Sequence, residues 1–301
     1  MKKSISIIDT LDIDIILHRD IHFGKNFDIM LDYYLEKKVG VMPDFPIERI
    51  QQLKKMEQSL HKPLSSYLPP MVDDIAMRAK TLYTNLRKIY AKHEKTDIAV
   101  LISDLILSES EFPTSEINAL IARGSDSVSP LIHIIHTTDF YDPLFPGYGR
   151  APIFAAHCLA KIGDTRAIIP LFEALGQENF FTDDAIISAL TQFGDKSKDF
   201  LLNRMQQKPY TKDNTHAVIA LTSFPEDSTI AETCLKLLQD PEVRKKDSFA
   251  NYLLFGCSGL IKQADRNTFK ALEKSDDFSS SLRSDMPVSY THLTLPTSDL
   301  V

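Results

Sequence analysis

A turn signal recurs at a regular interval through the middle of the sequence. Gly163 and Gly194 are 31 residues apart, and Pro225 follows Gly194 after another 31 residues. Gly124 precedes Gly163 by 39 residues, and we assign the surplus to an insertion at 139–149. A unit of this length holds two short helices, which bury their apolar stripes only by stacking on neighbouring units. The interval therefore predicts an all-α solenoid.

The segments on either side of each turn have the periodicity of helices. After Gly163, apolar residues occur at 168, 171, 172 and 175, which is the spacing of one helix face. A Gly or Pro at the turn ends the first helix, and the Asp, Ser or Thr that follows caps the second. We expect five apolar residues to be buried between adjacent helical pairs: Ala155, Leu159, Ile162, Leu171 and Leu175.

One unit resembles a known repeat. Residues 155–175 read AAHCLAKIGDTRAIIPLFEAL and are similar to the HEAT repeat in its bacterial, phycobilisome-lyase-like form, which runs Ala-Ala-x-x-Leu-x-x-Ile-Gly-Asp-x-Arg-Ala-Ile-x-x-Leu. The resemblance extends over residues 115–260, with looser matches in the flanking units. It implies a right-handed α-α superhelix, a HEAT-like solenoid, and it implies no activity, because nothing in the chain identifies a bilin site.

The pattern divides the chain into three regions. Residues 115–260 hold the repeats, and residues 261–301 are expected to form a poorly ordered tail. The tail contains VSYTHLTLPT, which resembles translated sequencing-adapter read-through, so we expect residues 287–301 to be non-native. Residues 1–114 are expected to be a mostly helical N-terminal region, with irregular or strand-like elements before residue 35. Its expected helices span 47–60, 73–93 and 97–107.

Composition and charge exclude several classes of protein. A hydrophobic fraction of 43% with 25% charged residues fits one or two globular domains and excludes a collagen-like or fully disordered chain. The net charge is -7, and the repeat region carries 18 acidic against 13 basic residues, which disfavours nucleic acid as a partner. Three scattered cysteines form no disulfide pattern, and no apolar run is long enough for a transmembrane helix. Because Asp9, Asp12 and Asp14 interrupt the only stretch that resembles a signal peptide, we expect a cytoplasmic protein.

The string from His18 to His22 carries the most chemically suggestive residues. His18 and His22 share a face of a helix, whereas His18, Asp20 and His22 share a face of an extended strand. Either conformation permits metal ligation through imidazole and carboxylate groups. The alternative is that these residues are structural or lie on the surface, which the frequency of unsupported motif matches favours.

The insertion at 139–149 concentrates aromatic residues and is followed by an arginine. Aromatic side chains and arginine dominate the energetics of protein interfaces. One interpretation is a partner-binding loop that is extended by the next inter-repeat turn and consists of Tyr141, Phe145, Tyr148, Arg150, Phe180 and Phe181. The alternative is that the aromatic residues fold back and close the gap between two poorly matched repeats.

Basic residues concentrate over 78–95. Six lysines and arginines accompany a single acid, Glu94, and a basic amphipathic helix is a candidate for binding RNA, an anionic lipid or an acidic partner. The alternative is a solvated helix face whose other side packs on the solenoid. The sequence contains no Walker loop, Rossmann fingerprint, Gly-x-Ser-x-Gly motif or paired-cysteine zinc pattern, which weakens an enzymatic interpretation.

These observations favour a non-enzymatic bacterial protein that acts as a scaffold or adaptor and binds a protein partner through its solenoid. The first alternative is a metal-dependent enzyme or metal-binding protein with a site near His18, Asp20 and His22. The second is a nucleic-acid-binding HEAT-like protein that uses the 78–95 helix, although the acidic repeats count against it. The sequence implies no cofactor.

Overall fold

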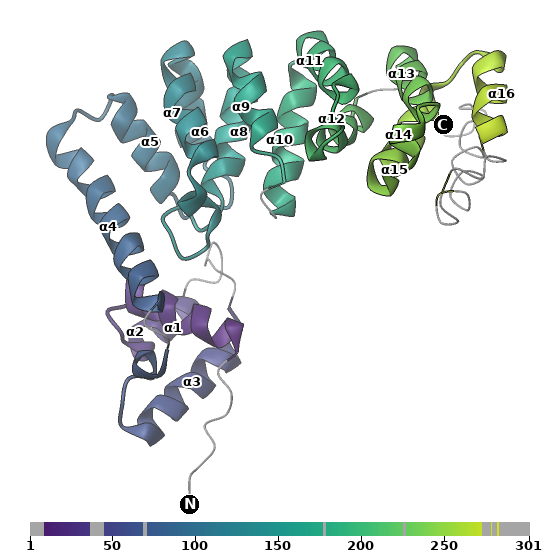
Figure 1. Cartoon of the computed structure of the whole chain (residues 1–301). Helices are drawn as coiled ribbons and strands as arrows, with labels where there is room; N and C mark the ends of the chain where they lie inside the picture. The colour runs from purple at the N-terminus through teal and green to yellow at the C-terminus, as the bar shows by residue number, and fades with distance from the viewer. Residues whose placement is uncertain are drawn as a thin grey trace, which may run out of the picture. The chain divides into compact units, whose positions relative to one another are not determined.

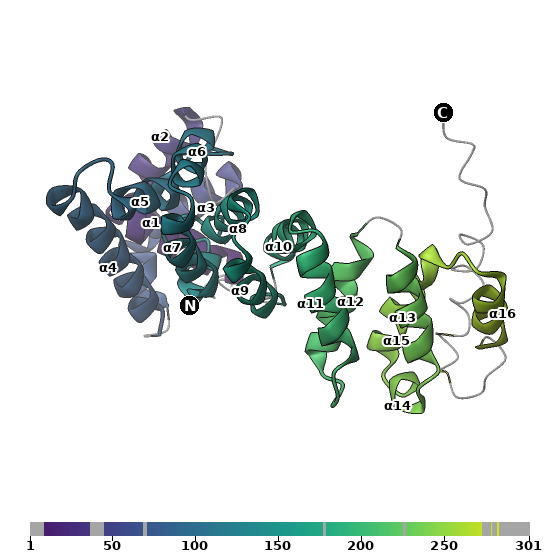
Figure 2. The same cartoon turned by 90° about the horizontal axis from the view of Figure 1, so that it is seen from above.

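Helices are the only regular secondary structure in the described part of the chain. The computed structural model describes residues 9–36, 45–68, 71–176, 179–224 and 227–272, together with Phe278 and Leu282. These residues form sixteen α-helices and four short 3-10 helices and contain no strand (Figure 1, Figure 2). The all-α prediction is confirmed. The segment 287–301, expected to be non-native, lies outside the described residues.

The chain consists of two compact units, Met1–Asp164 and Thr165–Val301, which we describe separately. This division does not coincide with the boundaries expected at residues 114 and 260. The helix α5 (Ile98–Leu107) packs on α6 (Thr114–Ala122), so the last helices of the expected N-terminal region share a unit with the first repeats.

The N-terminal unit contains the first eight α-helices of the described chain. α1 (Thr10–His22) begins where the Asp9 carboxylate accepts a hydrogen bond from the Asp12 amide at 2.9 Å. This N-cap and the packing of α1 outweigh the weak helix propensity of its isoleucines, so α1 and α2 (Phe27–Glu36) stand where irregular or strand-like elements were expected. The remaining elements are α3 (Ile47–Leu60), η1 (Leu64–Tyr67), α4 (Met71–Lys92), α5, α6, α7 (Ser125–His136), η2 (Thr138–Tyr141) and α8 (Ala151–Ile162).

Charged side chains are buried where α1 meets α3. Arg19 has no exposed surface, and its guanidinium pairs with Asp20 at 2.6 Å and with Glu57 of α3 at 2.5 Å. A second pair joins Arg49 of α3 to the buried Asp12 at 2.5 Å. Because buried charges are tolerated only when they are paired, these ion pairs fix how α3 packs on α1.

The C-terminal unit contains the remaining helices, and α10 to α15 lie side by side in both views (Figure 1, Figure 2). The elements are η3 (Thr165–Ala167), α9 (Ile168–Glu173), α10 (Phe180–Gln192), α11 (Asp195–Gln206), α12 (Lys212–Thr222), α13 (Ser228–Leu238), α14 (Pro241–Arg244), α15 (Asp247–Gly256), η4 (Cys257–Gly259) and α16 (Gln263–Leu272). α11 packs on α12, and α15 packs on both α12 and α13. The buried Asn214 amide of α12 donates to three carbonyls at the end of α11, at 2.8 to 3.1 Å, and so satisfies groups that the helix end leaves unpaired.

Two turns of the repeat have the same backbone geometry. Gly124 precedes α7 with φ 57° and ψ -129°, and Gly194 precedes α11 with φ 62° and ψ -136°. Such positive φ values favour glycine. Three residues later each turn buries a serine completely, Ser127 in one and Ser197 in the other. Gly163 is instead a left-handed C-cap of α8, so the regular interval in the sequence combines two kinds of turn.

The apolar residues predicted for the best-matching repeat are mostly buried. Ala155, Leu159 and Leu171 have no exposed surface, and Leu175 is 7% exposed. Ile162 is half-buried. The helical periodicity of this segment therefore identifies its buried face at four of the five positions.

The cysteines and the hydropathy of the helices agree with the sequence-based expectations. Cys158, Cys234 and Cys257 are all free and buried. Within the described ranges, every helix is too short or too polar to cross a lipid bilayer.

Candidate functional site

Two histidines of α1 and two tyrosines line a cavity in the N-terminal unit. The helical spacing of four places the ring centroids of His18 and His22 4.4 Å apart. The centroid of Tyr83, from α4, lies 5.0 Å from that of His22, and the centroid of Tyr148, from the insertion, lies 5.6 Å from it. The cavity has a volume of about 380 Å³, and its other lining residues are Phe23, Tyr33, Arg87, Leu107, Glu109 and Gly147. We call it the histidine–tyrosine cavity.

Polar atoms of this cavity are buried without protein partners. His18 is 1% exposed, and neither of its ring nitrogens has a hydrogen-bond partner in the described part of the chain. Nε2 of His22 is buried and unpartnered in the same way. A buried polar atom without a partner costs about 1–3 kcal/mol, and native proteins rarely contain one without a specific reason. Three such nitrogens at one cavity mark it as a candidate binding site.

The histidines are neutral at physiological pH. Burial lowers the pKa of His18 well below its ordinary value, and the neighbouring His22 lowers it further. Burial lowers the pKa of His22 to about 4, against a backbone hydrogen bond and the charge of Glu109, which act in the opposite direction. Burial also raises the pKa of the Tyr83 and Tyr148 hydroxyls. These four side chains therefore offer hydrogen-bond donors and acceptors but no charge.

Asp20 does not join the two histidines. Positions two apart on a helix point about 200° apart, and the Asp20 carboxylate pairs with Arg19 at 2.6 Å and lies 3.9 Å from Lys25. Over the residues that the structure describes, no three His, Cys, Asp or Glu side chains are placed so that they could hold a metal ion. The helix that unites His18 and His22 thus separates Asp20 from them, and the three predicted ligands are not brought together.

The aromatic insertion folds into the N-terminal unit. Phe145 is 2% exposed and belongs to the same hydrophobic cluster as the buried Ala79 of α4. The Tyr141 hydroxyl donates to a backbone carbonyl of α7 at 2.7 Å, and the Arg150 guanidinium lies 4.9 Å from the centre of an aromatic ring in α8. These contacts are those of the alternative in which the insertion closes the core, and Phe145 offers no surface to a partner.

The part played by Tyr148 was not apparent from the sequence. Tyr148 lies 126 residues after His22, and neither local periodicity nor a motif relates the two positions. The structure unites two features that the sequence analysis treated separately, the histidines of α1 and the aromatic insertion. Tyr148 has a positive φ of 51°, which is uncommon for a residue other than glycine. This backbone conformation could not be predicted from the sequence.

Phe180 and Phe181 begin α10 in the C-terminal unit and are both exposed. Their exposed fractions are 78% and 73%, and their ring centroids are 5.8 Å apart. Phe180 borders a cavity of about 260 Å³, which is also lined by Leu175, Gly176, Asp183, Asp184, Ile187, His216, Ile219 and Tyr252. We use the term phenylalanine face for the surface formed by Phe180, Phe181, Ile187, Ile219 and Tyr252.

The phenylalanine face crosses three neighbouring helices. α10 packs on α12, and α12 packs on α15 (Figure 1). Tyr252 continues along α15 to Phe255, whose side chain is 53% exposed and whose ring centroid lies 6.5 Å from that of Tyr252. The surface therefore extends over successive helices of the repeat instead of being confined to one loop.

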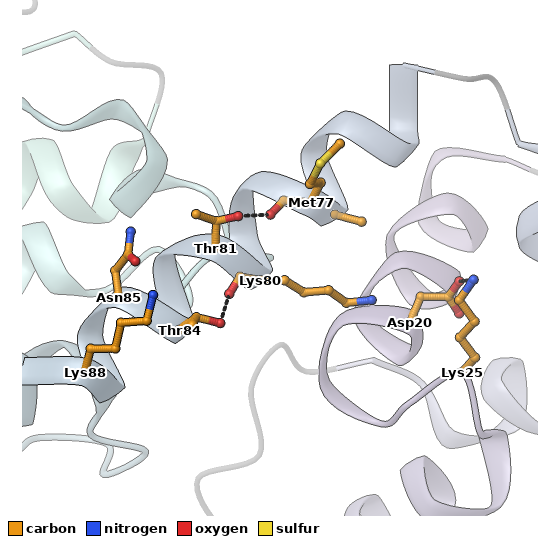
Figure 3. A pocket seen from close by; sticks show the side chains of 9 residues that line it. Asp20, Lys25, Met77, Lys80, Thr81, Thr84, Asn85 and Lys88 are labelled. Atoms are coloured by element: carbon orange, nitrogen blue, oxygen red, sulfur yellow. Dashed lines mark hydrogen bonds and ion pairs between the residues drawn. The ribbon is translucent and has the colours of Figure 1, made fainter. Parts of the chain in front are cut away.

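The basic helix predicted over 78–95 lies in α4 up to Lys92, where α4 ends, and α4 borders a third cavity, of about 500 Å³. Figure 3 shows Lys80 of α4 reaching toward Asp20 and Lys25 at the end of α1. The Thr81 and Thr84 hydroxyls beside it each donate to a carbonyl of their own helix at 2.8 Å (Figure 3). These threonines are satisfied locally, and the arrangement is that of a solvated helix face.

Neither the protein-family models nor the curated proteins include a match to this sequence.

Proposed function

We propose that the chain is a HEAT-like helical-repeat protein that acts as a scaffold or adaptor and binds another protein through the phenylalanine face. The observation that carries the proposal is the exposure of Phe180 and Phe181, at 78% and 73%. Burial of a phenylalanine side chain contributes about 1.5–3 kcal/mol of stabilising free energy. In the isolated chain Phe180 and Phe181 do not make this contribution, because both are exposed. Contiguous apolar side chains on a surface are characteristic of sites that a partner covers.

The repeat architecture supports this proposal. The regular interval in the sequence, the matching turns at Gly124 and Gly194 and the packing of α12 on both α10 and α15 are features expected of an α-solenoid. Solenoids bind their partners along surfaces to which successive repeats contribute. The phenylalanine face, with side chains from three neighbouring helices, is a surface of this kind.

Charge favours one chemistry for the partner. Among the described residues, the cavity beside Phe180 is lined by the carboxylates of Asp183 and Asp184 and by no lysine or arginine. Complementary charge at the rim of an interface steers association and excludes partners of the same sign. The partner that fits is a protein segment with large apolar side chains flanked by basic residues.

Affinity purification with matched variants tests the proposal. The wild-type chain, Phe180→Ser/Phe181→Ser and Ile261→Ser are each immobilised and exposed to an extract of the source organism, and bound proteins are quantified by mass spectrometry. Ile261→Ser is the control because Ile261 is 74% exposed and lies outside the phenylalanine face. We expect a protein retained by the wild type and by Ile261→Ser to be lost from the double variant.

The double variant should keep its helical circular dichroism, because both phenylalanines are exposed and contribute little to the core. If the three baits retain the same proteins in the same amounts, the phenylalanine face is not the binding surface. A partner rich in acidic residues would contradict the proposed chemistry.

A further inference from the structure

Aromatic rings hold the histidine–tyrosine cavity in shape. The centroid of the His18 ring lies 5.4 Å from that of Phe23, 5.5 Å from that of Phe45 and 6.2 Å from that of Tyr148. These separations are in the range of edge-to-face aromatic packing. Rings fixed in this way by their neighbours form a rigid wall, so the cavity is preformed and needs little reorganisation to accept a flat ligand.

The unpartnered nitrogens of the cavity restrict which chemical groups a ligand can carry. A neutral imidazole has one nitrogen that donates and one that accepts a hydrogen bond. His18 therefore presents an unused donor and an unused acceptor, and His22 presents a third unpartnered nitrogen at Nε2. A hydrocarbon or a lipid chain would leave all three unpaired. The matching ligand carries hydrogen-bond donors and acceptors of its own.

The electrostatic character of the cavity excludes a strongly charged ligand. Its buried histidines are neutral, and its charged lining residues are Arg87 and Glu109, which are both exposed and of opposite sign. Transfer of an ion from water into such a site finds no net opposite charge to offset the loss of hydration. The cavity therefore favours an uncharged molecule.

The volume of the cavity restricts the size of the ligand. Its volume of about 380 Å³ lies in the lower part of the range of small-molecule sites, roughly 300–1,000 Å³. Aromatic side chains stack on any flat ring that carries a π-face. A flat ring that also carries several nitrogen or oxygen atoms satisfies both the walls and the unpartnered nitrogens.

We propose that the histidine–tyrosine cavity binds a small, uncharged heteroaromatic ring of the nucleobase class, which stacks against the aromatic walls and forms hydrogen bonds with His18 and His22. This site is independent of the proposed protein-binding function, because its lining residues belong to the N-terminal unit and the phenylalanine face belongs to the C-terminal unit.

Titration of the full chain with adenine, hypoxanthine and uracil tests this proposal. Saturation-transfer NMR detects contact with each base, and calorimetry measures the dissociation constant; benzoate, a flat anion, is the control probe. We expect at least one base to bind with a dissociation constant of about 1 mM or tighter and benzoate not to bind. The proposal is overturned if no base receives saturation at millimolar concentration, or if benzoate binds as tightly as the best base.

Variants then locate the binding site. His18→Phe retains a flat ring but removes both nitrogens, and it should weaken binding of the best base about tenfold. His93→Phe is the matched control, because the His93 side chain is 43% exposed and does not line the cavity; its affinity should equal that of the wild type. His22→Phe removes the third unpartnered nitrogen, should weaken binding about threefold and serves if His18→Phe does not fold. Binding that neither cavity variant weakens would overturn the assignment.

Discussion

Both units of the chain bury neutral polar side chains, but among the described residues only the N-terminal unit also buries acidic and basic ones. In the N-terminal unit the buried residues include the ionisable Asp12, His18, Arg19 and Asp20. In the described part of the C-terminal unit the buried polar residues are Thr182, Ser197 and Asn214, which are all neutral. Both units expose some large apolar side chains, and the most exposed are Phe180, Phe181 and Ile261 of the C-terminal unit. The difference between the units therefore lies in the buried acidic and basic groups, which the described residues place in the N-terminal unit.

This contrast has a physical basis in how each unit is assembled. Helices that lie side by side, as α10 to α15 do, can obtain their stability from apolar contacts between neighbours, and a neutral core suffices for that. Buried ion pairs such as Arg19–Glu57 stabilise less per contact than apolar packing does, but they penalise every arrangement that separates the charges.

The largest effect is expected from a charge placed in the neutral core of the C-terminal unit. Leu171 of α9 is fully buried, so Leu171→Asp leaves an unpaired charge there and should lower the free energy of unfolding by about 3–5 kcal/mol. Ile169 lies two residues earlier and is 53% exposed, so Ile169→Asp should change it by no more than about 0.5 kcal/mol. Urea denaturation followed by circular dichroism measures both. Equal effects would contradict the orientation of α9.

Acid should weaken the N-terminal unit through its histidines. Burial lowers the pKa of His22 to about 4 from the ordinary 6.5, and Arg87 and Lys80 add to that lowering. Between these values the unfolded chain binds a proton that the folded chain does not, so the stabilising contribution is complete above about pH 6.5 and is lost as the pH falls toward 4. The loss from His22 alone is about 3 kcal/mol, and His18 acts in the same direction.

A variant without the two cavity histidines tests their contribution to the pH dependence of stability. In His18→Phe/His22→Phe the dependence of unfolding free energy on pH should be much flatter between about pH 7 and about pH 5, whereas His93→Phe should behave as the wild type. Burial raises the pKa of the Asp14 and Asp142 carboxyls, which gives a contribution of opposite sign that is common to all three proteins. A slope that the double variant leaves unchanged would show that the two imidazoles are not buried in neutral form.

A smaller loss of stability is expected at two turns of the same backbone geometry, one in each unit, and it should be equal at both. Gly124→Ala and Gly194→Ala each place a side chain where φ is close to 60°, and each should cost about 1–3 kcal/mol. At both positions an added Cβ would have no heavy atom within 4 Å, so the loss arises from backbone strain alone. Denaturation of the two variants compares them directly. A loss at only one position would show that the two turns are not equivalent.

Many of the helices could be predicted from the sequence because their determinants are local. A glycine at a fixed interval and apolar residues at helical spacing suffice to place the helices around Gly124 and Gly194 and to identify Leu159 and Leu171 as buried. The exposure of Phe180 agrees with its position at the start of a helix after a turn. In each case the residues that decide the outcome lie within one repeat of each other.

The histidine–tyrosine cavity could not be predicted because its determinants are distant in the sequence. The interval between His18 and His22 permitted a helix or a strand, and only the helix brings the two rings together while turning Asp20 away. Tyr83 and Tyr148 reach the same cavity from α4 and from the insertion, through contacts that local periodicity does not encode. Both the histidines and the insertion are unusual features of the sequence, but we expected them to form two different sites.

We infer that a small ligand binds in the N-terminal unit and that a protein partner binds on a separate surface of the C-terminal unit. Hydrogen–deuterium exchange of the full chain, followed by mass spectrometry with and without a saturating concentration of the base that binds best, tests this claim most directly. The account predicts slower exchange in peptides from α1, from α4 and from 138–150, and unchanged exchange in α10, α12 and α15. Slower exchange in α10, α12 and α15, or no change in α1 and 138–150, would contradict it.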